Sequence, residues 1–311
     1  MKKYAQIANF NVVFGKDEKP MLTYFDNVIF PAFTSGITKI SDMNEFLLTN
    51  IEVVRNQKGE CILMGQFVKK TILEIKSDIN EQGKLIEKDE QYSTAPYSSF
   101  AINLLNHRMI FIPNQKGSPS LANFRSAIKY IIKEFIKQQN KLLEEDKKLE
   151  FALINIVGIP SMSTLREILE NVEKINKLTL RFYPLNGDLD FEGVFGTITK
   201  EMREIVGSKN GEIVFKSPKS LAGVQEIIAE AAGTIDPVLQ VTTKENSKAT
   251  LRDNELSEKY EVDFKAEMEL GNEKELIIEQ MSKIKNLNYT NEMHESIYKE
   301  NEEKILPFIT K

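Results

Sequence analysis

The 311-residue chain has a single cysteine, Cys61, and only two histidines, His107 and His294. One cysteine excludes an internal disulfide and fits a reducing compartment. Two histidines and one cysteine cannot supply the ligands of a Cys/His zinc site. A Ser-His-Asp or Cys-His mechanism would have to depend on one of these two histidines.

Long apolar runs and nucleotide-binding loops are also absent from the sequence. No stretch of eighteen apolar residues occurs, so we expect no membrane-spanning helix. The polar residues Gln6, Asn9 and Asn11 interrupt what would be the core of a signal peptide. Neither the P-loop pattern nor GxGxxG occurs, so no standard nucleotide cradle is predicted. Hydrophobic residues at 41% and charged residues at 28% describe a soluble globular protein. Together with the single cysteine and the absent motifs, this leads us to expect a cytoplasmic protein without a cofactor.

Residues 1–117 predict an antiparallel, β-rich domain. A strand over 50–55, an Asn-Gln-Lys-Gly turn and a long strand over 60–78 form a predicted hairpin, rich in β-branched and aliphatic residues. Residues 100–113 are a further apolar run. The connections are too short for crossover helices, so we expect an antiparallel meander.

Residues 118–148 predict a long helix that connects two halves of the chain. Ser118 would be its N-cap and Pro119 its first residue, followed by apolar residues three and four apart. Residues 149–311 predict an α+β domain with two helices at its carboxyl end. The apolar run 151–157, a helix and a second strand suggest a β-α-β unit in a mixed sheet, with a ferredoxin-like arrangement as one candidate. The expected fold class is therefore α+β.

Five cations lie four residues apart on the predicted helix: Arg125, Lys129, Lys133, Lys137 and Lys141. Like charges at this spacing repel by roughly 0.2–0.5 kcal/mol per pair. Each step advances about 40° around the helix, so the charges would trace a diagonal about 24 Å long across its exposed side. Such a line suits the phosphates of a nucleic acid, bound with little sequence preference. An ordinary solvated helix face in a lysine-rich chain of net charge −5 is the alternative.

Glu74 and Lys76 form a Glu-x-Lys pair whose side chains share one face of a predicted strand. In restriction-type nucleases, a carboxylate at such a position holds a divalent cation and the lysine stabilises the developing charge. The upstream Asp of that motif is not evident, and Glu-x-Lys is common on surface strands. A Mg²⁺-dependent nuclease is therefore an alternative function, with Mg²⁺ as its cofactor.

Two further sets of residues are candidates for chemistry. Asp188, Asp190 and Glu192 follow an Asn-Gly turn at a spacing of two. If this segment is extended, the three carboxylates share a face that suits Mg²⁺ or Ca²⁺; a hydrated loop is the alternative. His107 interrupts an apolar run and is a candidate acid or base, or else a hydrogen-bonded structural histidine.

The segments Tyr97–Phe100 and Asn106–Phe111, together with Ser118–Leu121, resemble uncharacterised prokaryotic proteins from phage-defence and mobile-element neighbourhoods. The resemblance implies a context, antiviral immunity in a bacterium, and carries over no functional residue. The leading hypothesis is a protein that binds nucleic acid, or a nucleic-acid-bound partner, through the helix at 118–146. A scaffold that binds another protein or a second copy through its carboxyl-terminal helices is a further alternative.

Overall fold

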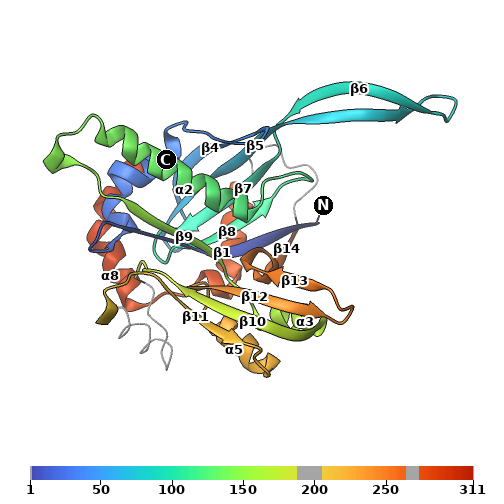
Figure 1. Ribbon diagram of the computed structural model, residues 1–311. Coiled ribbons are helices and arrows are strands. Elements are labelled where there is room, and N and C mark those ends of the chain that lie inside the picture. Colours follow the sequence, from blue (N-terminus) through green and yellow to red (C-terminus); the bar gives the residue numbers. More distant parts are fainter. Residues whose placement is uncertain (1, 188–204, 264–272, 311) are drawn as a thin grey trace.

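The computed structural model describes residues 2–187, 205–263 and 273–310 (Figure 1). The strands are β1 (Lys2–Phe14), β2 (Lys19–Pro20), β3 (Lys39–Ser41), β4 (Asn44–Arg55), β5 (Cys61–Ile79), β6 (Leu85–Thr94), β7 (Tyr97–Asn103), β8 (Arg108–Pro113), β9 (Ala152–Gly158), β10 (Val172–Phe182), β11 (Gly211–Lys216), β12 (Ile235–Thr243), β13 (Lys248–Leu251) and β14 (Lys259–Asp263). The helices are α1 (Phe30–Thr34), α2 (Leu121–Asn140), α3 (Met162–Glu170), α5 (Leu221–Glu230), α6 (Asp253–Leu256), α7 (Lys274–Lys283) and α8 (Glu292–Asn301).

The strands form two sheets, and all pairs of these strands are antiparallel. In the larger sheet seven strands follow the order β14-β1-β8-β7-β5-β4-β3, with β9 and β2 also paired to β1 and β6 to β5. The smaller sheet has the order β11-β10-β12-β13. The α+β class and the antiparallel, β-rich amino-terminal part are confirmed.

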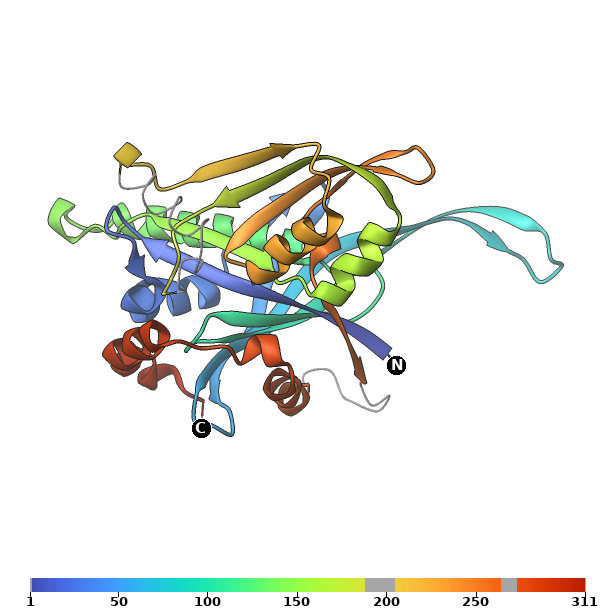
Figure 2. The ribbon, with the colours of Figure 1, turned by 90° about the horizontal axis from the view of Figure 1, so that it is seen from below.

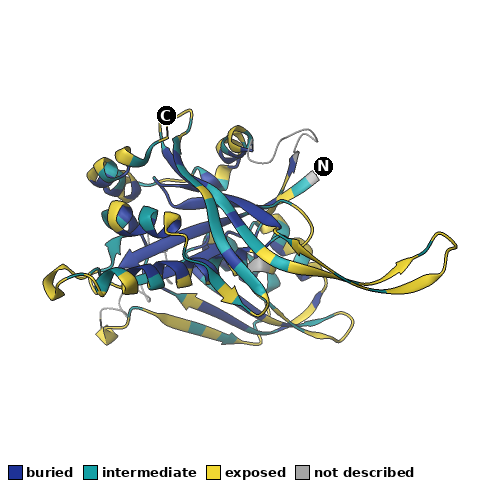
Figure 3. Ribbon diagram, turned by 90° about the horizontal axis from the view of Figure 1, so that it is seen from above, coloured by how far each residue is buried: buried dark blue, intermediate teal, exposed yellow. Residues whose placement is uncertain are grey.

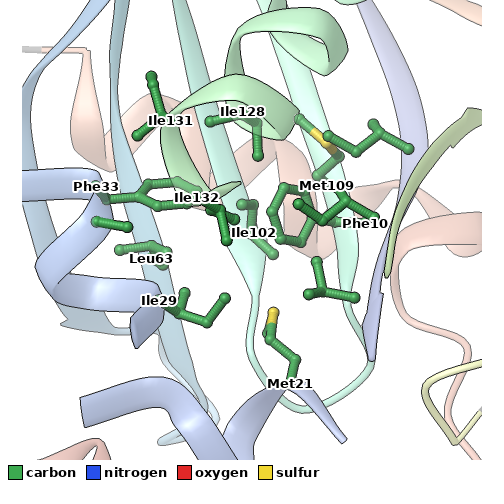
Figure 4. Packing of buried hydrophobic residues seen from close by; sticks show 14 of the residues in the cluster. Phe10, Met21, Ile29, Phe33, Leu63, Ile102, Met109, Ile128, Ile131 and Ile132 are labelled. Atoms are coloured by element: carbon green, nitrogen blue, oxygen red, sulfur yellow. The ribbon is translucent and has the colours of Figure 1, made fainter. Parts of the chain in front are cut away.

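The helix α2 packs on one face of the larger sheet, with its Ile128, Ile131 and Ile132 in the core between them (Figure 4). Several phenylalanine residues also belong to this core. The ring of Phe124 on α2 lies 4.9 Å from that of Phe100 and 5.5 Å from that of Phe111. Apolar residues of α7, such as Ile277 and Met281, cover the other face. Strand β7 is buried along its whole length, because both of its faces are covered.

The helix predicted from residue 118 begins at Leu121. Ser120 is the N-cap, because its hydroxyl accepts a hydrogen bond from the Asn123 N–H while the Asn123 side chain bonds back to the Ser120 N–H. This reciprocal pair is a capping box. The hydroxyl of Ser118 instead donates to the carbonyl of Tyr97, 2.7 Å away, and ties the preceding loop to β7.

The predicted hairpin of β4 and β5 is confirmed, and β5 continues beyond its pairing with β4. Strand β5 pairs with β4 and β7 only up to Lys70, and from Thr71 onward it pairs with β6 alone. This part projects into solvent, as all three views show (Figures 1, 2 and 3). We call residues 72–93 the arm.

The expectation of a mixed sheet in the second half is wrong. Strand β9 pairs with β1 in the larger sheet, so β9, α3 and β10 do not form a β-α-β unit within one sheet. A ferredoxin-like sheet contains that split β-α-β unit, which this strand order lacks. The physical reason is that β14 pairs with β1 only from Lys2 to Gln6, and β1 pairs from Ala8 to Phe14 with the apolar strand β9. Helices α3 and α5 cover one face of the smaller sheet.

A seam of buried polar groups joins the two sheets. The Asn11 side chain donates to the Pro184 carbonyl and accepts from the Asn186 N–H, each at 2.5 Å. The hydroxyl of Tyr183 donates to the carbonyl of Gly233, also at 2.5 Å, and Asn9 donates to the same carbonyl. The polar residues of β1 therefore hold the segments that lead into and out of the smaller sheet.

Candidate functional site

The basic strip, which we define as Arg125, Lys129, Lys133, Lys137 and Lys141, runs along the side of α2 that faces away from the sheet. The four lysines are exposed and Arg125 is half-buried. This gradient follows from the four-residue spacing, because Arg125 lies closest to the apolar face that α2 buries. The structure brings the five predicted residues together on one surface.

Within the described residues, one of the four lysines of the strip forms an ion pair. The ion pairs around α2 are Lys137–Glu134 at 3.2 Å, Lys147–Glu144 at 2.9 Å, and Lys148–Glu145. Glu144 and Glu145 thus pair with lysines of the turn that follows α2, and not with the strip. At the other end of the strip, the charge of Asp236 acts on Arg125 and Lys129.

A cleft of about 390 Å³ opens beside the amino-terminal end of the strip, between α2 and the smaller sheet. Its walls come from five elements: Arg125 and Lys129 of α2, Asn155–Val157 of β9, Arg181–Tyr183 at the end of β10, Asn210–Glu212 at the start of β11, and Asp236 of β12. Arg181 lies 3.6 Å from Glu212 and 3.9 Å from Asp236. Three cations and two carboxylates therefore meet at this cleft.

The two α2 residues at the cleft have lowered pKa values. Burial lowers the pKa of the Arg125 guanidinium, and the carboxylate of Asp236 opposes that shift. Although Lys129 is exposed as a residue, loss of solvation at the cleft lowers its pKa, and repulsion from Arg125 lowers it further. A cation pair with this arrangement is stabilised by an added anion.

The predicted Glu-x-Lys pair lies on the exposed arm. Lys76 forms ion pairs of 3.3 Å with Glu74 and with Asp89 of β6. Hydrogen bonding to Glu74 raises the pKa of Lys76. Across residues 2–187, 205–263 and 273–310, no group of three or more His, Cys, Asp or Glu side chains is arranged to hold a metal. The nuclease alternative remains an untested prediction.

The two histidines of the chain meet in the core. His107 lies in the turn between β7 and β8 with a φ of 58°, and its ring packs edge-on against that of His294 on α8, at 6.0 Å between centroids. Both residues are fully buried. The carbonyl of His107 accepts from the Phe10 N–H at 2.8 Å. This packing supports the structural interpretation of His107 over the catalytic one.

The remaining predicted metal ligands, Asp188, Asp190 and Glu192, lie outside the described residues. Conversely, no pattern in the sequence singles out the cleft residues Arg181, Phe182 and Asp236. They come from strands far from α2 along the chain, and only the packing of the two sheets brings them to the strip.

No family model matches the chain, and no curated protein is similar to it in sequence. Within the part of the chain that the structure describes, no helix combines the length and apolar character needed to cross a membrane.

Proposed function

We propose that the protein binds nucleic acid through the basic strip and the adjoining cleft, as a component of a bacterial antiviral system. The observation that carries this proposal is the juxtaposition of Arg125 and Lys129 at the wall of the cleft, where poor solvation and mutual repulsion lower the pKa of Lys129. A phosphate in the cleft would offset both effects, because an anion stabilises the protonated amine. The antiviral context is an implication of the sequence resemblance alone.

The extent of the strip favours a long polyanion over a small anion. Successive cations are about 6 Å apart along α2, and phosphates repeat every 3.4 Å along a strand. The half-buried ring of Phe182 also lines the cleft, beside these cations. An aromatic face next to a row of cations is the combination that binds unpaired bases without sequence preference. We therefore expect single strands to bind at least as well as duplexes.

The first prediction concerns the triple variant Lys129→Glu/Lys133→Glu/Lys137→Glu. We expect it to lose binding to labelled single-stranded DNA, RNA and duplex DNA in fluorescence anisotropy titrations at several salt concentrations. For the unmodified protein, five phosphate contacts on a duplex give a log–log salt slope of about −4.5, or about −3.6 if Lys137 remains paired with Glu134.

The matched control changes to Glu three exposed lysines that lie away from α2, namely Lys219, Lys244 and Lys299. Its net charge equals that of the strip variant, so a general effect of charge would weaken both proteins alike. Equal binding by the two variants, or a binding constant that does not respond to salt, would contradict the proposal.

A further inference from the structure

The arm is a two-stranded hairpin that carries apolar and acidic side chains on both faces. Leu73 is directly opposite Tyr92, and Ile79 is directly opposite Leu85. Because side chains alternate along a strand, these residues share one face with Ile75 and its opposed partner Glu90, whereas Glu74 and Asp78 share the other face with Ile72 and Ile86. The arm therefore exposes apolar side chains, although it has no core of its own to cover.

The apolar side chains of the arm are in solvent. The exposed fractions are 55% for Leu73, 66% for Ile79, 76% for Leu85 and 51% for Tyr92. Within the described residues β6 pairs with β5 alone, and the arm appears as an exposed projection in Figure 3. An isolated hairpin of two strands is marginally stable in water. Exposed apolar side chains gathered on one projecting element are typical of an interaction site.

The charge of the arm indicates the kind of surface that covers it. Residues 72–93 contain six carboxylates and three lysines. The complementary surface is therefore basic and has an accessible apolar group. The basic strip on α2 meets both conditions, because Tyr130, 43% exposed, lies among its lysines.

We infer that the arm of one copy of this protein docks on the basic strip of a second copy. Docking within one chain is excluded by the direction of the arm, which extends away from α2 and from the body of the protein (Figures 1 and 2). A second copy supplies the required surface at the same concentration as the arm itself. The opposite charges of the arm and the strip favour this pairing, and the like charges of two arms oppose a contact between arms.

The contact has a consequence for the form of the assembly. It joins two different surfaces, so each copy has one arm to give and one strip to receive. Interfaces of this heterologous kind generate rings if the rotation closes and open chains if it does not. The arm and a nucleic acid would share the strip, so self-association and nucleic-acid binding should compete. The arm contact does not itself depend on nucleic-acid binding.

The test uses two oppositely charged variants of the full chain, freed of nucleic acid. In the arm variant Glu74, Glu81 and Glu87 are each changed to Lys. The strip variant is Lys129→Glu/Lys133→Glu/Lys137→Glu. All six positions are exposed, so circular dichroism spectra and thermal midpoints should match those of the unmodified protein.

Mass is measured by sedimentation velocity over a range of protein concentrations. We expect the unmodified protein to exceed the monomer mass of 35.6 kDa as concentration rises, and to return to it at high salt. Each variant alone should stay monomeric where the unmodified protein associates. An equimolar mixture of the two variants should associate again, because each arm then meets a strip of opposite charge.

An unmodified protein that stays monomeric at every concentration overturns the inference. So does a mixture of the two variants that remains monomeric, since lost association in the single variants would then have another cause. A Leu73→Ser/Tyr92→Ser variant, which keeps all charges, should weaken association by at least tenfold. Undiminished association of this variant would show that the apolar side chains of the arm do not contribute to the contact.

The same proteins separate this inference from the proposed function. The arm variant keeps the whole strip, so it should bind labelled single-stranded DNA at least as well as the unmodified protein does. If it associates as predicted in the mixture but neither protein binds nucleic acid, the proposed function fails and the arm contact stands.

Discussion

The carboxylate of Glu273 links the larger sheet to the helix that covers it. It accepts hydrogen bonds from the hydroxyls of Ser99 at 2.6 Å and Tyr97 at 3.2 Å, and lies 3.5 Å from the Lys3 amino group. Burial, and the neighbouring negative charge, raise the pKa of Tyr97 from its ordinary value of 10.0 to about 12. A phenol held in this way must stay protonated for the contact to persist.

This shift predicts a loss of stability in alkaline solution. Since the pKa of Tyr97 is raised in the folded state, its contribution is complete below pH 10, where the unfolded chain also keeps the proton, and is lost as the pH rises toward 12. The shift corresponds to at most about 3 kcal/mol of folding free energy. Urea unfolding from pH 8 to pH 11.5 should show that Tyr97→Phe depends less steeply on pH than the unmodified protein. Parallel pH profiles for the two proteins would contradict this prediction.

At the scale of elements, the arm stands apart from the core that holds the protein together. None of residues 72–93 belongs to a hydrophobic core cluster, whereas β5 up to Phe67 supplies several core residues. The folding of the body should therefore not depend on the arm, in the same way that surface loops tolerate length changes.

Replacing residues 72–93 by an Asn-Gly turn between Thr71 and Thr94 tests this independence. The two threonines are a directly opposed pair, so a two-residue turn can close the hairpin there. We expect the thermal midpoint to change by less than about 3 °C, the equivalent of under 1 kcal/mol for a chain of this size. Insoluble protein, or a large fall in the midpoint, would show that the arm supports the body.

The elements predicted correctly are those with strong local signals. The hairpin of β4 and β5 follows from its turn and its β-branched residues, and α2 follows from its apolar spacing. The run 100–113 forms two strands, β7 and β8, separated by a turn at residues 104–107. Asn106 and His107 interrupt the apolar run at this turn, but both are buried, so the sequence alone suggests polar residues within a strand. Residues 21–34 form short helices that the sequence did not reveal, since their apolar residues contact the core on several sides.

In the sequence, Val172 and Ile175 continue the helical spacing of the helix predicted after the run 151–157, but α3 ends at Glu170. Val172 and Ile175 belong to β10, where they pack under α3 and α5. Their β-branched side chains suit a strand, and pairing with β12 overrides the helical spacing. For the site, the strip could be predicted because it lies on one helix. The cleft could not, because Arg181 and Asp236 reach it only through the packing of the two sheets.

At the scale of the whole molecule, the polar seam makes the two sheets one unit. Asn9 and Asn11 interrupt the apolar pattern of the first strand in the sequence. In the structure, both are buried at the junction. Buried amides of this kind are stable only when their hydrogen bonds are made. The sheets should therefore unfold together, because opening the junction leaves these groups without partners.

Asn11→Leu should lower the free energy of unfolding by about 2–4 kcal/mol, since it leaves the Asn186 N–H and the Pro184 carbonyl without their bonds. Asn176→Ala is the matched control: it removes an amide hydrogen bond to Thr242 within the smaller sheet and should cost about 1 kcal/mol or less. Urea unfolding followed by circular dichroism should give one transition for the unmodified protein. Two separate transitions would show that the sheets are independent.

The burial of both histidines in the core also affects the charge of the protein surface. No imidazole of this protein is in contact with water, and imidazole is the side chain whose ordinary ionisation falls between pH 5 and 8. The surface therefore keeps nearly the same charge throughout that interval. Mild acidification would leave the attraction of this surface for a charged molecule almost unaltered, whereas a change in ionic strength would alter it at once.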